Sequence, residues 1–308
     1  MTKILLPAAQ ILLALLLAPL LPGLINRVKA FFAGRRGRPL LQSYRDIAKL
    51  LRKGAVYSRT VGWVFRAGPV VGTAAAACAL TLLPWGGTPA LLAFEGDLIL
   101  LAYLLGLMRF FTVLAALDTG SAFEGMGASR EAWFSALAEP ALLLALAAVA
   151  RDTGSLSLSA FLPVRGAFYG AGSGAALLLA AGAAYVVYLA ENARVPVDDP
   201  DTHLELTMIH EVMVLDHGGP DFGLIQYGAS LKLWVLGAVV AGMLFPSTGS
   251  AAWDTVLLVG GELCLAAVTG IVESLNARLK MVRVPQLLIC AAAMAALSLA
   301  LMMTRGMA

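Results

Sequence analysis

The sequence predicts an all-α, polytopic membrane protein with eight transmembrane helices and with cytoplasmic amphipathic helices in the first loop and in the loop between the fifth and sixth helices. Of its 308 residues, 60% are hydrophobic and only 13% are charged, whereas about a quarter of the residues of a soluble domain are charged. The mean hydropathy is +0.84. Eight apolar runs approach the length of about 17 to 25 residues that a helix needs to cross a bilayer. They cover roughly 4–25, 67–84, 98–117, 134–150, 172–190, 231–246, 253–273 and 285–304.

The first apolar run is predicted to be a retained span rather than a cleaved signal peptide. It has no small-residue cleavage site before Arg27, and the chain continues directly into a basic segment. The whole chain, 1–308, is therefore expected to form a single membrane domain. Its cytoplasmic loops are expected at about 27–66, 118–133, 191–229 and 274–284.

Lysine and arginine are distributed unevenly between the two predicted sides of the membrane. Sixteen of the twenty-two lie in the four loops of one side, eleven of them in the first loop, and four lie on the other side. Short basic loops are held on the cytoplasmic face. We therefore expect both termini to lie outside.

The first loop is long for a connection between two helices, so it is expected to contain structure. Glycines and Pro39 break the chain, and the following LLQSYRDIAKLLRK has the apolar spacing of a short amphipathic helix at the interface. The loop is either a basic, lipid-facing topology anchor or a docking surface for a partner protein. Nucleic-acid binding is not expected, because no aromatic-interleaved basic module accompanies the charges.

The second loop, LDTGSAFEGMGASREAWF, is rich in glycine and small residues. Ser129 is expected to cap the helix that follows, and the dipole of the new amino terminus suits Glu131 in its first turn.

Glu139, Glu262 and Glu273 are acids within predicted spans. Glu139 is surrounded by leucine and alanine, where desolvation penalises an ionised carboxylate. It is either a structural ion pair with Arg109, in the facing span, or part of a proton or ion path. Glu262 and Glu273 raise the same question, and their spacing of eleven residues places them on one face of the seventh span.

The stretch from 191 to 219, ENARVPVDDPDTHLELTMIHEVMVLDHGG, gathers most of the titratable side chains of the protein. Extended to Asp221, it holds eight of the nineteen carboxylates. Pro200 suits the first turn of a helix, and Gly218 and Gly219 suit its end, so an amphipathic helix is expected here. The stretch also holds all three histidines, which are His203, His210 and His217.

The three histidines recur every seven residues and would fall on nearly one face of this helix. Seven residues span about 10.5 Å, so these histidines cannot ligate one metal ion. The segment is either a polar interfacial helix whose charges face water or a partner, or an acidic funnel that exchanges protons at the membrane surface. Because Cys78, Cys264 and Cys290 lie far apart in apolar runs, no metal site, redox dithiol or iron–sulfur cluster is expected in this chain.

Three stretches carry a resemblance to a known family: PLLPGLINRVKAFFAGRRGRPLLQSYRDIAKLL, LDTGSAFEGMGASREAWFSALAEP and ENARVPVDDPDTHLELTMIHE. In this order they resemble subunit 1 of respiratory complex I and its homologues in membrane-bound [NiFe] hydrogenases. The similarity covers essentially the whole chain. It implies eight transmembrane helices, no redox centre, and a subunit that anchors a cytoplasmic redox arm to antiporter-like proton-pumping subunits.

The residues and the resemblance together predict four functional groups. The proton or ion path is expected to contain Glu131, Glu139, Glu191, Asp198, Asp199, Glu205, Glu211, Glu262 and Glu273. Their ion-pair partners are expected to be Arg109, Arg130 and Arg194. The histidines are expected to be the pH-sensitive groups. The peripheral arm is expected to dock on Arg35, Arg36, Arg38, Arg45 and Asp46.

The loop after the fifth span departs from the pattern of quinone-using members of the family. Those members usually have PFDLPEAEAEL followed soon by EYSG, whereas this chain has PVDDPDTHLEL and then IHEVMVLDHGG. His203 replaces an acid, and Val197 replaces an aromatic residue. These changes put a quinone headgroup site in doubt and favour the hydrogenase branch.

The predicted function is that of a membrane-arm subunit in a membrane-bound [NiFe] hydrogenase complex of formate hydrogenlyase type, which couples electron transfer to proton or ion translocation through buried acids. The chain is expected to have no catalytic centre and no cofactor of its own, with the [NiFe] centre and the iron–sulfur clusters in partner subunits. Those partners are the hydrogenase large and small subunits, iron–sulfur subunits and antiporter-like membrane subunits, in the cytoplasmic (inner) membrane of a bacterium or archaeon. The alternatives are a quinone-binding subunit 1 of a respiratory NADH dehydrogenase (complex I) and a purely structural membrane anchor.

Overall fold

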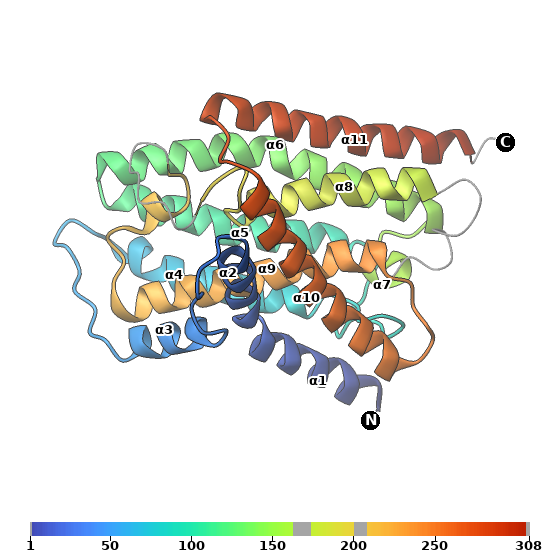
Figure 1. The fold of residues 1–308 in the computed structure, drawn as a ribbon, viewed down its shortest axis with the longest axis horizontal. Helices are drawn as coiled ribbons and strands as arrows, with labels where there is room; N and C mark the ends of the chain where they lie inside the picture. Colours follow the sequence, from blue (N-terminus) through green and yellow to red (C-terminus); the bar gives the residue numbers. More distant parts are fainter. Residues whose placement is uncertain (1, 163–173, 200–207, 306–308) are drawn as a thin grey trace.

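The computed structural model describes residues 2–162, 174–199 and 208–305. Within these ranges the secondary structure is helical, with one isolated β-bridge between Trp85 and Thr88. Most of the long helices lie along the long axis of the molecule, and α10 crosses them obliquely (Figure 1). The all-α class predicted from composition and periodicity is confirmed.

The helices differ widely in length. The first three are α1 (Thr2–Leu17), α2 (Leu20–Phe32) and α3 (Gln42–Leu51). The next group is α4 (Trp63–Leu80), α5 (Asp97–Asp118), α6 (Ala122–Thr153) and the short α7 (Leu158–Phe161). The last group is α8 (Gly174–Glu191), the 3-10 turn η1 (Glu211–Val214), α9 (Gly219–Leu244), α10 (Ala251–Leu275), the 3-10 turn η2 (Met281–Arg283) and α11 (Val284–Arg305).

The number of membrane spans agrees with the prediction. Seven helices of the described chain are long and apolar enough to cross a membrane, and α1 with α2, bent by 43° at a short break, forms an eighth candidate. Pro19 lies in this break. Because proline has no N–H to donate to the preceding turn, it interrupts the helix there.

Two predicted loops are much shorter than expected, because α6 begins at Ala122 and α9 begins at Gly219. The predicted cap at Ser129 is wrong, since Ser129 lies inside α6 and its hydroxyl donates to the Met126 carbonyl. The glycine-rich sequence serves packing instead of ending the helix. A Cβ at Gly127 would lie 2.9 Å from Met213 and 3.0 Å from the carbonyl oxygen of Ile209, so only glycine admits that segment against α6.

The two predicted amphipathic helices have different outcomes. The helix in the first loop is present as α3, which packs on α9. The prediction of a helix between Pro200 and His217 is wrong for the described part, 208–218, which contains only the four-residue turn η1. Residues 200–207 lie outside the described residues. Backbone groups of the described part form hydrogen bonds with Asp198 and Arg130. These tertiary hydrogen bonds override the helical periodicity of the sequence.

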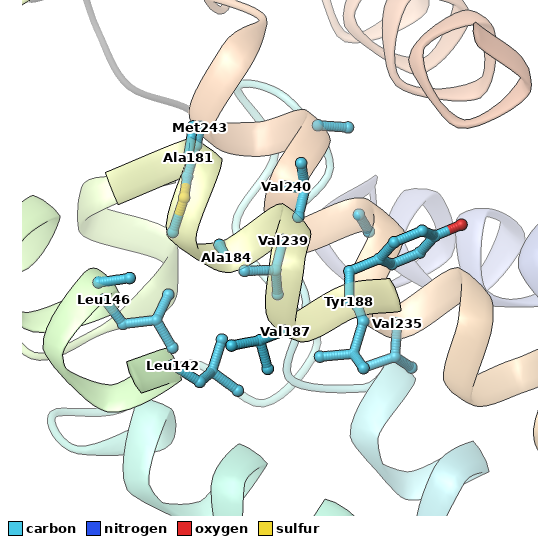
Figure 2. Close-up of a cluster of buried hydrophobic side chains, with 14 of the residues drawn as sticks. Leu142, Leu146, Ala181, Ala184, Val187, Tyr188, Val235, Val239, Val240 and Met243 are labelled. Carbon is cyan, nitrogen blue, oxygen red and sulfur yellow. The ribbon is translucent and has the colours of Figure 1, made fainter. Parts of the chain in front are cut away.

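The most buried of the candidate spans is α9. Figure 2 shows Leu142 and Leu146 of α6 and several side chains of α8 meeting Val235 and Val239 of α9. The shared core places α8 between α6 and α9, while α11 covers α6 and α8, and α10 packs on α2 and α9. In a membrane such packing rests on van der Waals contact and small residues, which suits the alanine-rich sequence of α8.

Candidate functional site

Arg109, on α5, is the centre of a group of buried charges. Its Nε lies 3.4 Å from Glu131, its Nη2 lies 2.7 Å from Glu191, and its Nη1 bonds to Glu139. Glu131 and Glu139 lie on α6, and Glu191 is the last residue of α8. The expected pair between Arg109 and Glu139 is therefore present, as part of a larger arrangement that uses the several donors of one planar guanidinium.

Lys232, on α9, gives Glu191 a second cation. Its Nζ lies 2.7 Å from Oε2 of Glu191, while Arg109 donates to Oε1. Lys232 is 7% exposed and lies near the middle of α9. Sequence reasoning left Lys232 out of the site. The available signal was a lysine within an apolar span, which is rare unless the charge is paired.

His210 lies between two acids from different parts of the chain. Its Nε2 is 3.2 Å from Glu131, and its Nδ1 is 3.4 Å from Asp198. Only the protonated imidazolium can donate from both nitrogens. Burial alone would lower the pKa of His210, but the carboxylates of Glu131 and Asp198 outweigh that effect and raise the pKa above its ordinary value. His210 is therefore a proton-binding bridge within the site.

Asp198 holds the two ends of the segment that follows it. It lies 2.7 Å from Arg278 and accepts N–H bonds from Asp199 at 3.0 Å and from Ile209 and His210 at 3.2 Å. Burial alone would raise the pKa of Asp198, but His210 and Arg278 hold it below its usual value. Asp198 is thus an ionised anchor for the loop.

Glu273, on α10, joins two helices to the loop. Its side chain is fully buried, with Oε2 lying 3.0 Å from Lys29 of α2 and Oε1 lying 3.6 Å from Arg194. Lys29 also lies 4.0 Å from Asp199. These contacts connect α2 and α10 to the same segment that Asp198 anchors.

The contacts described so far form one continuous set, which we call the ionic network. It comprises Lys29, Arg109, Glu131, Glu139, Glu191, Arg194, Asp198, Asp199, His210, Lys232, Glu273 and Arg278. Six are carboxylates, five carry a permanent positive charge, and one is His210. A protonated His210 therefore balances the charges of these twelve side chains.

Exposure varies sharply within the ionic network. The side chain of Glu139 is 48% exposed, whereas the other members are at most 24% exposed. Glu139 lies near the middle of α6, a candidate membrane span. The ionic network therefore reaches the outer surface of this chain at a membrane-spanning helix.

Glu262, Glu211 and Glu205 are the remaining predicted acids. Glu262, on α10, is 1% exposed and forms no ion pair among the described residues. Glu211 begins η1. His203 and Glu205 lie outside the described residues.

Two further predicted residues contact the protein interior. Arg130 donates to the carbonyl oxygen of Met208 at 2.9 Å. His217 is 7% exposed and stacks on Phe65, with ring centroids 3.8 Å apart. Burial lowers the pKa of His217 to about 4, so this histidine is neutral near pH 7 and differs from His210.

The predicted docking residues lie on the surface of the first loop. Arg35, Arg36, Arg38 and Arg45 are exposed, and Asp46 is half-buried and accepts a hydrogen bond from Gln42 at 2.8 Å. They are at the same end of the molecule as the described part of the 192–218 loop, through the contact of α3 with α9. Among the described residues, no group of three histidine, cysteine or acidic side chains could hold a metal ion.

Comparison with known proteins gives consistent matches over nearly the whole chain. A family model described as NADH dehydrogenase matches residues 5–305. Formate hydrogenlyase subunit 4 of Escherichia coli (strain K12) is 35% identical over 272 residues, which cover 88% of this chain and 85% of that protein. Hydrogenase-4 component C of the same organism is 34% identical over 239 residues, which cover 77% of this chain and 74% of that protein.

A solved structure has the same fold. A chain of the membrane-bound sulfane sulfur reductase, an archaeal respiratory membrane complex, superposes with a TM-score of 0.81 over 97% of this chain and 100% of its own length. The two sequences are 22% identical, so this likeness concerns the fold alone.

Proposed function

Because the chain belongs to the NADH dehydrogenase family, which is that of complex I subunit 1, we propose that it is a membrane subunit of a [NiFe] hydrogenase complex of formate hydrogenlyase type. Its role is to anchor the cytoplasmic redox arm and to couple electron transfer to proton or ion translocation. The similarity to formate hydrogenlyase subunit 4 and to hydrogenase-4 component C supports the hydrogenase branch.

The continuity of the ionic network is the observation that carries this proposal. The network leads from Asp198 and Asp199, in the loop next to the predicted docking surface, through His210 and Arg109 to Glu139. A charge added near the loop changes the electrostatic energy of every paired acid along this line, and ion pairs in a protein interior are weakly screened. A redox change in the docked arm would thereby alter proton binding at the other end.

The exposure of Glu139 supports a proposal for the position of the next subunit. A carboxylate that is half-exposed at the middle of a membrane-spanning helix is costly in contact with lipid. We propose that a neighbouring antiporter-like subunit covers Glu139 and receives the change from it. The [NiFe] centre and the iron–sulfur clusters belong to the other partners, and the complex lies in the cytoplasmic membrane with the first loop facing inward.

The experiment compares Glu139→Gln with wild type in the whole complex, in membrane vesicles that report both hydrogen turnover and pH change. The substitution removes the charge while keeping the shape of the side chain, so hydrogen turnover is expected to persist while turnover-driven proton movement falls. Glu95→Gln is the matched control, because Glu95 lies in an exposed loop and contacts Ser155 and Leu156 rather than the ionic network. Wild-type values of both quantities in Glu139→Gln would refute the relay.

The same preparation separates the alternatives. Copurification with hydrogenase large and small subunits supports the hydrogenase branch, while NADH-oxidising subunits and a bound quinone would assign the chain to complex I. If Glu139→Gln changed only the amount of assembled complex, the chain would be a structural anchor.

A further inference from the structure

Glu262 is an isolated acid in the middle of α10. The residue is 1% exposed, and neither carboxyl oxygen has a hydrogen-bond partner among the described residues. Its carboxyl group rests on the backbone of α9 at Gly237, where an added Cβ would lie 3.0 Å from the carboxyl carbon and closer still to one oxygen. A glycine at 237 therefore makes room for the carboxyl group.

An ionised carboxylate in this position would have no compensating charge. The cost of burying an unpaired ion in a membrane interior is several kcal/mol or more, and a bound proton removes it. A metal ion would need several oxygen, nitrogen or sulfur ligands, and the described residues contain no such group. The ligand that fits Glu262 is a proton.

A line of hydroxyl groups leads from Glu262 toward the ionic network. On α10, Thr269 and Glu273 follow Glu262 by seven and eleven residues, so all three lie on one helix face over about 16 Å. On α8, the side chain of Tyr188 lies near both Thr269 and Glu262. Tyr185 stacks on Tyr188, with ring centroids 5.8 Å apart, and its side chain lies near Glu273.

The hydroxyl of Thr269 donates to the Leu265 carbonyl at 2.8 Å, whereas those of Tyr188 and Tyr185 are otherwise unexplained in an apolar interface. Tyr188 is 1% exposed, and in Figure 2 its hydroxyl oxygen points away from the aliphatic side chains around it. The hydroxyl of Tyr185 is buried without a hydrogen-bond partner among the described residues. Buried hydroxyls are normally hydrogen-bonded, so the tyrosine hydroxyls of this interface have unused capacity to pass a proton.

Glu262 also lies close to a pocket on its other side. The pocket is partly open to the surface and is lined by Leu258 and by Ala241 of α9, among others. Leu258 precedes Glu262 by one helical turn, which is about 6 Å. Glu262 thus lies between the hydroxyl line and this pocket.

We propose that Glu262 is a proton-binding position within this chain, and that it exchanges its proton with the ionic network through the hydroxyls of Tyr185, Thr269 and Tyr188. This proton route leads from the ionic network to Glu262 and is separate from the surface position of Glu139. The use of this proton in coupling rests on the proposed function, whereas proton binding by Glu262 does not.

The test is infrared spectroscopy of the whole purified complex, at rest and without turnover. A neutral carboxylic acid has a carbonyl stretching band distinct from that of a carboxylate, and this band shifts when deuterium replaces the proton. The expected result is a buried-acid band that disappears in Glu262→Gln and persists in Glu95→Gln. An unchanged band in a folded, assembled Glu262→Gln complex would overturn the assignment.

Milder substitutions test the route and distinguish loss of the bound proton from misfolding of the complex. Tyr188→Phe keeps the stacked ring and removes the hydroxyl, so the band is expected to remain while its exchange with deuterium slows. Gly237→Ala should shift or abolish the band, whereas Gly260→Ala, where an added Cβ meets nothing within 4 Å, should leave it unchanged. Unaltered exchange in both Tyr188→Phe and Tyr185→Phe would overturn the hydroxyl route.

The outcome is independent of the proposed function. If the complex moves no protons during turnover, the proposed function fails while the Glu262 band is unaffected. If proton movement depends on Glu139 but the band is absent, the proposed function stands and this inference fails.

Discussion

His210 is the member of the ionic network whose charge depends on pH near neutrality. It connects Glu131, which contacts Arg109 on α5, with Asp198, which anchors the loop. With His210 neutral, the ring carries no positive charge, and its ion pairs with Glu131 and Asp198 are lost. A single proton therefore decides whether the helix part and the loop part of the ionic network are joined.

For His210→Gln we expect a loss of stability that depends on pH. The raised pKa of His210 means that its contribution is fully present below its ordinary pKa and is lost as pH rises through the raised pKa. The variant should therefore be less stable than wild type by about 2 kcal/mol in mild acid, the scale of a charged hydrogen bond, and nearly equal to it in alkali. Thermal unfolding of the purified complex across this range measures the difference, and a gap that grows with pH would contradict the assignment.

His217→Phe is predicted to have the opposite pH dependence. The pKa of His217 is lowered to about 4, so the neutral ring stabilises the fold above the ordinary histidine pKa, and this contribution is lost as pH falls toward 4. Phenylalanine keeps the stack on Phe65 and cannot be protonated. The variant should gain about 2 kcal/mol over wild type near pH 5 relative to their difference near pH 7. Paired unfolding curves at the two pH values provide the measurement, and parallel curves would disprove the prediction.

Lys232→Met is predicted to destabilise the protein through Glu191. The lysine and Arg109 share this buried carboxylate, and removal of one partner of a buried ion pair costs about 3 kcal/mol. The double variant Lys232→Met with Glu191→Gln should recover part of the loss, because the uncompensated charge is gone. A double-mutant cycle on unfolding free energies gives the coupling, and strictly additive losses would show that the contact carries no energy.

At the scale of elements, the end of α8 determines how the loop enters the ionic network. Ala193 follows the helix with φ of 53°, and Arg194 then turns back to donate its N–H to the Leu189 carbonyl. This left-handed turn directs the Arg194 side chain toward Glu273. The turn that ends α8 is therefore also the turn that supplies a cation to α10.

Ala193→Gly is predicted to stabilise the protein, since glycine adopts the left-handed conformation without the steric cost that alanine bears, about 1 kcal/mol. The gain should appear as a higher unfolding temperature with unchanged assembly. As a control, Ala190→Gly, within α8, should lower the unfolding temperature because glycine weakens a helix interior. A lower temperature for Ala193→Gly as well would refute the argument.

The sequence predicted the spans well because their signal is local. Apolar runs of membrane length define α4, α5, α10 and α11 to within a few residues. The sequence did not predict the first turns of α6 and α9, because the glycine, serine and acidic residues there are typical of loops. Tertiary contacts stabilise these segments as helices. The helix expected after Pro200 failed in its described part for a related reason, since Asp198 and Arg130 bond its backbone into the protein.

The candidate site was predictable for its acids, for His210 and for two of its cations, Arg109 and Arg194. A charged residue in an apolar run is conspicuous, and Arg109, Glu139 and Glu273 were found in this way, whereas Glu191 was found as the first residue of the acid-rich loop. Lys29 and Arg278 were missed because a lysine or arginine in a basic loop looks the same whether it sets topology or pairs with a buried acid. Only the folded arrangement, which brings Lys29 to Glu273 and Arg278 to Asp198, separates the two uses of positive charge.

For the whole molecule, the uneven distribution of lysine and arginine predicts both termini outside. A reporter enzyme that is active only in the cytoplasm should be inactive when fused after residue 305 and active when inserted near Gly54, in the first loop. The insertion at Gly54 serves as the control for expression. Activity of the C-terminal fusion would require an odd number of spans or the opposite orientation.

The position at which α8 ends also has an electrical consequence. Glu191 closes α8, yet its partners Arg109 and Lys232 lie near the middles of α5 and α9. A proton that reaches Glu191 from the loop side has therefore crossed part of the transmembrane voltage. Moving one charge across the whole membrane involves about 2.3 kcal/mol per 100 mV, so a half-way position involves about half of that. The proton occupancy of the ionic network should consequently respond to membrane voltage as well as to pH.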